Sequence, residues 1–215
     1  MLRFTKEDNL PMVAKLYRTL AACLLFPGIF WVSQVSVKAD TITFEADPIG
    51  LFPNGSQSVH SNLVRFSASG GGALMVIEDF GLNQVRGTRG LAVFGSNTDL
   101  IMEFAVPVTS LSLWFGNDDL SLTVPGDTAI LQVSFEDEFV DEIFVLLNRD
   151  DIMNQQISFS GATITRARFR FSQDLNLAET VDNIEFTPVP EPTTVALLGI
   201  GIAGVVARIR RRKSR

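Results

Sequence analysis

Between Asp40 and Pro192 the sequence alternates between short β-prone runs and clusters of turn-forming residues. The turn clusters include Pro53-Asn54-Gly55, Gly70-Gly71-Gly72 and Pro125-Gly126-Asp127. Short β-prone runs at this even spacing are typical of an all-β sandwich or barrel. The strands that we expect lie at residues 41–46, 63–68, 74–78, 91–94, 100–105, 110–115, 120–124, 130–136, 143–147, 157–160, 163–172 and 181–186.

Several of these runs show the two-residue period of a half-buried strand. In 163–172, Ala167, Phe169 and Phe171 share one face, and Arg166, Arg168 and Arg170 share the other. In 110–115, Leu111, Leu113 and Phe115 share a face. No amphipathic helix longer than two turns is visible in this part of the chain, and residues 136–143 are expected to form a loop or a short turn.

The composition changes when the two ends of the chain are set aside. Of the 18 Lys/Arg, five precede Asp40 and six follow Pro192, which leaves seven, all of them Arg. Of the 24 Asp/Glu, two precede Asp40, so 22 remain and the net charge is near −15. Such a body repels nucleic acid and acidic glycans, so we expect no nucleic-acid partner. Its length corresponds to one domain.

The first 39 residues resemble a secretory signal peptide in which Met12 is a plausible second start. A basic segment precedes a largely apolar run over 19–32, and Val37 and Ala39 fit the −3 and −1 positions of a cleavage site. We therefore expect a mature N-terminus near Asp40 and export through the Sec machinery; an uncleaved N-terminal anchor is the alternative. Cys23 is the only cysteine and leaves with the signal, so the body has no disulfide and no thiolate ligand.

The C-terminus has the pattern of a membrane span with a basic stop. Residues 195–207 are uncharged and apolar, and a helix of that length spans about 20 Å against a hydrocarbon core of about 30 Å. The cluster that follows predicts an N-out, C-in orientation; it contains Arg208, Arg210, Arg211, Arg212 and Lys213. A buried core helix followed by a basic tail is the alternative.

Pro190-Glu191-Pro192, the apolar run and the Arg-rich end together resemble the PEP-CTERM sorting signal of Gram-negative bacteria. The resemblance covers the last 27 residues, from Val189 onward. It implies that Pro190, Glu191 and Pro192 are recognised by an exosortase, an intramembrane cysteine transpeptidase. It also implies an inner-membrane precursor whose body then reaches the envelope, the outer surface or the extracellular matrix. The expected domains are 1–39 signal, 40–187 β-sandwich and 188–215 sorting signal.

The body is similar in pattern to the jelly-roll domains that PEP-CTERM proteins often carry, which are related in shape to carbohydrate-binding modules. The matching segments are the opening run 41–46 and the closing run 181–186. The resemblance implies that the first and last strands pair, and that a structural Ca²⁺ lies where they meet. Its ligands would be Glu45, Asp47 and Asp182, with loop carbonyls, because Ca²⁺ prefers oxygen donors. Alternatively, Asp182 and Asn183 cap a turn.

Glycan binding and catalysis have less support from individual residues. By alternation Trp114 lies opposite Leu113 and Phe115, so it is either a glycan platform or part of a covered sheet face. The sole histidine, His60, has no partner residue at a meaningful spacing, and no nucleophile-elbow, HExxH or phosphate-loop motif is present. Ion pairing with acidic neighbours is the expected role of the arginines at 166, 168 and 170, and an anionic glycan is the alternative.

These observations predict a non-enzymatic, exported protein with a structural or adhesive role in the envelope or an exopolysaccharide matrix. A carbohydrate-binding module is the first alternative function. A secreted glycan hydrolase that uses a pair of carboxylates is the second.

Overall fold

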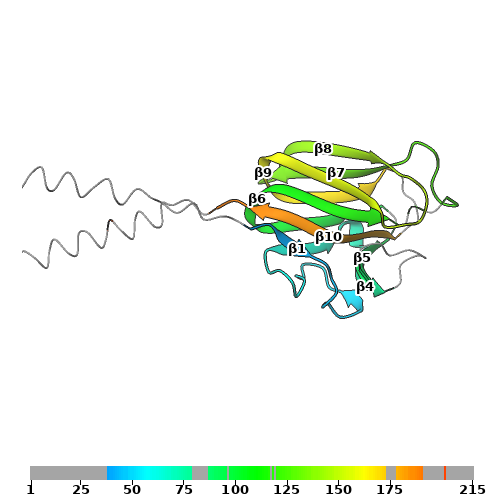
Figure 1. The fold of residues 1–215 in the computed structure, drawn as a ribbon, viewed down its shortest axis with the longest axis horizontal. Coiled ribbons are helices and arrows are strands. Elements are labelled where there is room, and N and C mark those ends of the chain that lie inside the picture. Colours follow the sequence, from blue (N-terminus) through cyan, green and yellow to red (C-terminus); the bar gives the residue numbers. More distant parts are fainter. Residues whose placement is uncertain are drawn as a thin grey trace, which may run out of the picture. The chain divides into compact units, whose positions relative to one another are not determined.

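The computed structural model describes residues 38–78, 87–95, 97–116, 118, 120–172, 178–190 and 201, and the described body is built from β-strands (Figure 1). The strands are β1 Asp40–Ile42, β2 Gly50–Phe52, β3 Val64–Ala68, β4 Ala73–Glu78, β5 Arg89–Phe94, β6 Leu100–Gly116, β7 Thr128–Phe135, β8 Glu138–Leu146, β9 Gln155–Phe171 and β10 Glu179–Pro188. A 3-10 turn, Ser69–Gly71, follows β3. The prediction of an all-β sandwich is confirmed.

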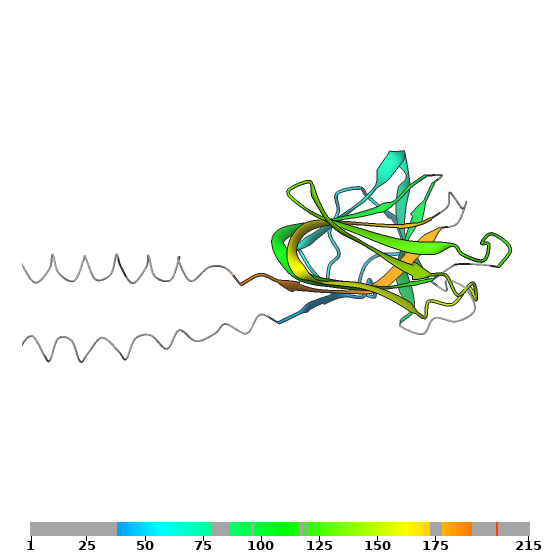
Figure 2. The same ribbon diagram turned by 90° about the horizontal axis from the view of Figure 1, so that it is seen from above.

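The strands form one continuous antiparallel sheet in the order β2-β4-β5-β10-β6-β9-β7-β8, with β1 added to β10 and β3 added to β6. The long strand β6 changes partner along its length, pairing with β3 over 100–104 and with β10 over 108–116. Both of its halves also pair with β9. Figure 2 shows these long strands bending, so that the sheet curls over and its two layers face each other. The curl places one face of each layer in a shared core.

The core is aromatic as well as aliphatic. Phe44, Phe52 and Phe66 form one set of edge-on contacts, with ring centroids 5.5 to 6.5 Å apart. Phe115, Phe169 and Phe171 form a second set with centroids 5.4 to 6.2 Å apart. Fully burying such a side chain contributes about 1.5–3 kcal/mol. The predicted alternation in β6 and β9 is confirmed, because Leu111, Leu113 and Phe115 of β6 and Ala167, Phe169 and Phe171 of β9 are all buried.

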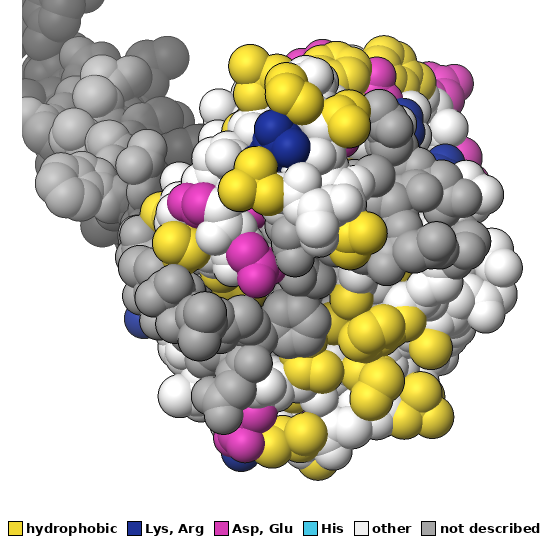
Figure 3. All heavy atoms as spheres, turned by 90° about the vertical axis from the view of Figure 1, so that its right-hand side faces the viewer, with side chains coloured by type: hydrophobic (Ala, Val, Ile, Leu, Met, Phe, Trp, Pro, Cys, Tyr) yellow, Lys and Arg dark blue, Asp and Glu magenta, His cyan; other side chains and the backbone are white. Residues whose placement is uncertain are grey.

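Parts of the strand prediction are wrong. The predicted strand 41–46 ends at Ile42, the runs 100–105 and 110–115 form one strand, β6, and the runs 157–160 and 163–172 form one strand, β9. Residues 120–124 form a turn that exposes Leu120, Leu122 and Val124. Figure 3 shows that hydrophobic side chains are exposed on the face of the body that it draws. Residues 136–143, predicted to be a loop, contain a tight turn at Glu136 and Asp137 and then most of β8. The short strand β2 was not predicted. In β8 tertiary pairing overrides composition, since the strand is stabilised by its ladder with β7 despite its acidic residues.

The pairing of the first and last strands is confirmed. Asp40 lies opposite Phe186, and Ile42 lies opposite Ile184. The two ends of the described body therefore leave the sandwich side by side, and Figures 1 and 2 both show them at one end of it. Among the described residues, no helix is long and apolar enough to cross a membrane. Of the predicted signal peptide over 1–39, residues 1–37 lie outside the described residues, and so does the predicted span over 195–207 apart from Gly201.

Candidate functional site

The sorting tripeptide begins directly after the last strand. Two contacts with β6 hold the end of β10 and the residue after it. The Thr109 hydroxyl lies 3.4 Å from the carbonyl of Thr187, and the N–H of Val189 donates to the carbonyl of Pro107 at 2.8 Å. Pro190 is the first exposed residue after this point. Glu191, Pro192 and the basic cluster lie outside the described residues. The body thus holds its chain in place up to the residue before the tripeptide.

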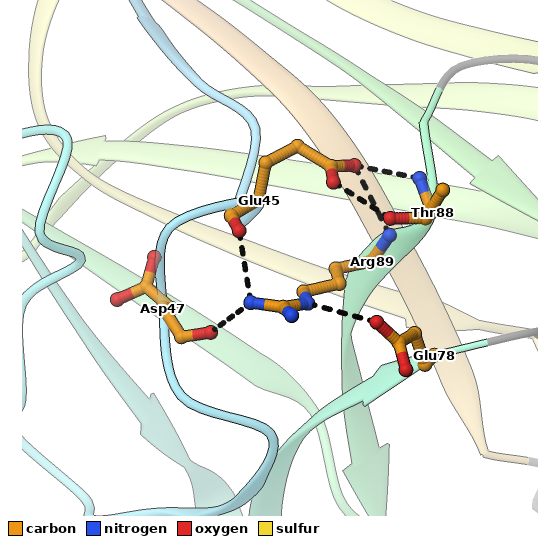
Figure 4. Close-up of polar contacts among 5 residues, drawn as sticks. All are labelled: Glu45, Asp47, Glu78, Thr88 and Arg89. Atoms are coloured by element: carbon orange, nitrogen blue, oxygen red, sulfur yellow. Dashed lines mark hydrogen bonds and ion pairs between the residues drawn. The ribbon is translucent and has the colours of Figure 1, made fainter.

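Two of the three expected calcium ligands, Glu45 and Asp47, lie next to Arg89, as Figure 4 shows. Both oxygens of the Glu45 carboxylate accept hydrogen bonds, from the N–H of Thr88 at 2.6 Å, the Thr88 hydroxyl at 2.8 Å and the N–H of Arg89 at 3.1 Å. Partial burial alone raises the pKa of Glu45, but these bonds and the charge of Arg89 outweigh it and hold that pKa below its usual value. Glu45 is therefore a carboxylate that protein donors already satisfy in part.

Arg89 binds two backbone carbonyls of the loop that contains the expected ligands Glu45 and Asp47. Its Nη1 donates to the carbonyl oxygens of Glu45 and Asp47, both at 2.9 Å, and its Nε donates to Glu78 at 3.3 Å (Figure 4). The group formed by Glu45, Asp47, Glu78, Thr88 and Arg89 is called the Arg89 knot below. It joins the loop after β1 to the start of β5, so a guanidinium supplies the positive charge at this position.

The Asp47 carboxylate does not point toward Glu45 and Asp182. It accepts hydrogen bonds from the Ser58 hydroxyl at 2.5 Å and from the N–H of Val59 at 2.9 Å. Across the parts of the chain that the structure describes, no three His, Cys, Asp or Glu side chains are grouped so that they could hold a metal ion. The three-carboxylate arrangement expected from the sequence is therefore not assembled; Glu45 and Asp182 come together without Asp47.

Asp182 is buried within β10, where its Oδ1 has no hydrogen-bond partner. Burial first, and the charge of Glu45 second, raise its pKa to about 7. Gly87 lies beside both carboxyls: a methyl group added there would displace Glu45 Oε1 and would lie 3.4 Å from Asp182 Oδ2. Asp182 and Asn183 do not cap a turn as the alternative proposed: they lie inside the strand, next to a register shift.

A second buried carboxyl, Glu179, lies three residues earlier in the same strand. Its Oε1 accepts the N–H of Phe171 at 2.8 Å, while its Oε2 has no partner. Burial first, and the charge of Asp99 second, raise its pKa to about 8, and Arg170 and Arg168 only partly offset this. Near neutral pH this side chain is mostly a protonated acid. No sequence pattern had indicated that the Glu179 carboxyl is buried.

The predicted pairing of the three arginines is confirmed. Arg166 pairs with Asp137 at 3.0 Å, Arg168 pairs with Asp99, and Arg170 lies 3.6 Å from Glu142. We call Arg166, Arg168 and Arg170 the arginine stripe. A groove of about 300 Å³ runs beside it across the outer face of β6, β7 and β9. Its lining includes Gln132, Ser134 and Phe139, and the Phe139 side chain is 64% exposed.

Trp114 is half-buried, with buried neighbours on either side in the strand, so its predicted orientation is confirmed. It lies opposite Asp182 on one neighbouring strand and Gln156 on the other, and it does not line the groove. The exposed aromatic that does line it, Phe139, was missed because 136–143 was taken for a loop. His60 is exposed in the loop before β3, where its Nε2 lies 3.4 Å from the Thr43 hydroxyl.

The junction after β10 corresponds to a known sorting element. Residues 188–212 carry a PEP-CTERM protein-sorting motif. The motif indicates an exported protein that an exosortase processes, and it begins at the last residue of β10. The remainder of the chain, 1–187, lies outside this match.

Comparisons of the whole chain and of its fold give weaker likenesses. No curated protein sequence matches the chain. The fold is similar to the CBM22-1 xylan-binding domain of Xyn10C from Paenibacillus barcinonensis (10% identity, 70% of this chain and 94% of that one, TM-score 0.42). It is also similar to the K2 cleaved adhesin domain of Lys-gingipain (17%, 70% and 98%, TM-score 0.42) and to a family 6 carbohydrate-binding module (14%, 57% and 87%, TM-score 0.35). TM-scores below 0.5 carry no argument about ligand or activity.

Proposed function

We propose that this protein is an exosortase substrate whose β-sandwich serves as a structural or adhesive component of the cell envelope or an exopolysaccharide matrix. The observation that carries the proposal is the PEP-CTERM motif at 188–212, which starts where β10 ends. In this proposal the C-terminal span holds the precursor in the inner membrane, with its basic cluster on the cytoplasmic side. Cleavage near the tripeptide then releases a folded, strongly acidic body.

The position of the motif supports cleavage of a folded substrate. Every strand of the sandwich lies before Pro190, and the contacts of Thr187 and Val189 fix the chain just ahead of the tripeptide. Cutting after that point removes none of the strand pairing of β10. The mature body keeps its fold after release, as an envelope or matrix component requires.

Mass spectrometry of the mature C-terminus tests this proposal. In the native host we expect a mature form that ends near the tripeptide, and we expect Pro190→Ala/Pro192→Ala to accumulate uncut precursor. Pro125→Ala, at an exposed turn of the same body, is the matched control and should be processed normally. A mature protein that still carries its Arg-rich end would show that the tail is a plain anchor, and would overturn the sorting step.

Glycan binding is a second function that one observation favours, the groove beside the arginine stripe. It combines an exposed aromatic ring, Phe139, with hydrogen-bonding side chains at Gln132 and Ser134, the combination by which polar ligands are oriented in such sites. We propose that an extracellular polysaccharide binds here. The pairing of Arg166 and Arg168 with carboxylates favours a neutral polysaccharide over an anionic one.

Pull-down with matrix polysaccharides separates this site from the one predicted from sequence. Phe139→Ala is expected to abolish retention, and Trp114→Ala, which changes an aromatic outside the groove, is expected to leave it intact. The opposite pattern would transfer the glycan platform to Trp114. No retention of the unchanged protein on any matrix glycan would end the proposal.

We also propose a Ca²⁺ site whose carboxylate ligands are Glu45 and Asp182, without Asp47. The unpartnered Asp182 Oδ1 supports it, because a buried carboxylate oxygen without a donor is satisfied by a cation as well as by a proton. The melting temperature is then expected to rise with Ca²⁺, to fall with EDTA and to lose this response in Asp182→Asn. Asp47→Asn, whose carboxylate binds Ser58 and Val59, is the control that should keep it. A melt that EDTA leaves unchanged in the native protein would rule the site out.

A further inference from the structure

The sheet ends at β8, and one side of this strand has no neighbouring strand in the described part of the chain. The strand order stops there, and β8 pairs only with β7 among the described strands (Figure 1). With nine residues it is three times as long as the strand at the opposite end of the order, β2, which has three. Long open edges of this kind are sites where another extended chain can add.

The hydrogen bonds show which backbone groups face outward. The N–H of Leu147 donates to the carbonyl of Asp127 at 2.9 Å, while the N–H of Ser172 donates to that of Thr128 at 2.7 Å. Because both backbone groups of a residue in an antiparallel ladder point the same way and successive residues alternate, the odd-numbered residues 141–147 face β7. Glu142, Phe144 and Leu146 therefore direct their N–H and C=O groups to the open side.

Part of this edge is already satisfied, and part is not. The Gln155 side chain donates to the carbonyl of Leu146 at 2.7 Å, and the Asp141 carboxylate accepts the N–H of Glu142 at 2.9 Å. Within the described residues, both backbone groups of Phe144, the carbonyl of Glu142 and the N–H of Leu146 have no such partner. An added strand would complete the ladder at these positions.

The side chains at this edge are apolar and acidic. Phe144 and Leu146 share a face and are 57% and 66% exposed. The turn before β8 and the strand itself carry five acidic residues between 136 and 142 and no basic residue. Among the described ion pairs, Arg166 and Arg170 neutralise Asp137 and Glu142, which leaves Glu136, Glu138 and Asp141 exposed without a cation.

We propose that β8 is a docking edge for an extended, cationic segment of a partner protein, one that alternates Lys or Arg with apolar residues. The open backbone groups at 142–146 would pair with the partner's main chain, and Phe144 and Leu146 would contact its apolar side chains. Its basic side chains would face the three uncompensated carboxylates. A second copy of this chain is disfavoured, since its own β8 brings the same carboxylates and a body with a net charge near −15.

The test uses the full chain, expressed with its own signal and purified in a non-ionic detergent. Fluorescence anisotropy measures binding of a labelled Lys-Val-Lys-Val-Lys-Val-Lys peptide. We expect saturable binding that weakens as salt is raised from low to physiological concentration, because the charges are at the surface. A Glu-Val alternating peptide should not bind, and a peptide of equal charge with proline in place of valine should bind at least about tenfold more weakly, since proline cannot supply the ladder N–H.

The deciding variant is Phe144→Pro, which removes an outward N–H while leaving the β7 ladder intact, because that N–H faces away from β7. We expect it to weaken peptide binding at least about tenfold with little change in melting temperature. If this variant is unstable, Phe144→Lys serves instead and should weaken binding by charge repulsion. Leu122→Ala, at an exposed apolar residue of the 120–124 turn and outside β8, is the control that keeps binding.

Three results would overturn the proposal. The first is no binding of the cationic peptide to the unchanged protein. The second is equal binding of the valine and proline peptides, or undiminished binding by both Phe144 variants, which would mean that charge alone attracts the peptide. The third is a dimer, detected by light scattering, that Phe144→Pro dissociates; this would assign the edge to a second copy of the chain.

Discussion

The Arg89 knot and the arginine stripe use the same guanidinium chemistry for different purposes. Arg89 binds backbone carbonyls of a loop more than 40 residues away in sequence, and that loop has no strand partner at those positions. The stripe arginines stand on β9, whose backbone is already held by ladders to β6 and β7, and they bind carboxylates on the sheet surface. The knot therefore determines the path of a loop, while the stripe adds to a surface that is already formed.

Each region also lies next to one buried carboxyl of β10. Asp182 faces Glu45 of the knot, and Glu179 lies near Arg168 and Arg170 of the stripe. Neither carboxyl has a salt bridge of its own among the described residues, because Arg89 binds the loop and the stripe arginines bind other acids. The comparison shows that nearby arginines which bind other acids lower the pKa of Glu179 only in part, because desolvation of the carboxyl outweighs their charge.

The largest expected effect is a fall in stability as the pH rises. Burial raises the pKa of Asp182 from 3.8 to about 7 and that of Glu179 from 4.5 to about 8. Below the unfolded-state pKa values both carboxyls are protonated in either state, and their stabilising contribution is complete. As the pH rises toward the folded-state pKa values this contribution is lost, because the unfolded chain releases protons that the folded protein still binds. Each group contributes about 1.4 kcal/mol per pH unit in this range, so the free energy of unfolding should fall by on the order of 4 kcal/mol from pH 5 to pH 7.

Urea unfolding at several pH values checks this, and two variants apportion it. Asp182→Asn and Glu179→Gln should each flatten the pH dependence, and the double variant should nearly remove it. A body as stable at pH 8 as at pH 5 in the absence of divalent cations would contradict the prediction. If Ca²⁺ flattens the pH dependence of the unfolding free energy and this effect depends on Asp182 alone, the calcium proposal gains direct support.

Removing the centre of the knot comes next in size. Arg89→Ala leaves two loop carbonyls without their charged donor, and we expect a loss of about 2–3 kcal/mol. This corresponds to a fall in melting temperature of roughly 4–12 °C for a domain of this size. Differential scanning calorimetry measures it. Arg89→Lys, which keeps the charge but not the fork of donors, should fall in between.

Arg168→Ala should cost less, about 1 kcal/mol, because Arg168 is itself nearly half-exposed although its partner Asp99 is almost fully covered. The loss comes mainly from leaving Asp99 without its cation. Chemical denaturation compares this variant with Arg89→Ala under the same conditions. A cost for Arg168→Ala equal to or greater than that for Arg89→Ala would break the distinction between surface stripe and loop knot.

Arg166→Ala is expected to change stability least, by at most about 0.5 kcal/mol, since its partner Asp137 is 84% exposed. The melting temperature should stay within about 2 °C of the unchanged protein, and added salt should remove the difference. A measurable loss that persists at high salt would show that Arg166 acts through packing along the groove and not through its ion pair.

Much of the fold was predictable because it depends on local alternation. Phe169 and Phe171 point inward and their arginine neighbours outward for the same geometric reason, and the sequence shows that period directly. The first half of β8 was not predictable, because its acidic residues disfavour a strand locally and the ladder with β7 stabilises it; the second half lies within the predicted strand at 143–147. The exposed ring of Phe139 could not be assigned to a groove without that strand.

The sequence by itself determined the sorting motif, because recognition there depends on a short linear order of residues: a tripeptide, an apolar run and a basic end. It also determined the charge of the body and the inward and outward faces of its clearest strands. Only the tertiary structure decided that Arg89, not a cation held by Asp47, binds the loop carbonyls, and that Asp182 and Glu179 are buried. The physical reason is that desolvation and hydrogen-bond partners arise from segments that are distant in the chain, and composition does not show which of them meet.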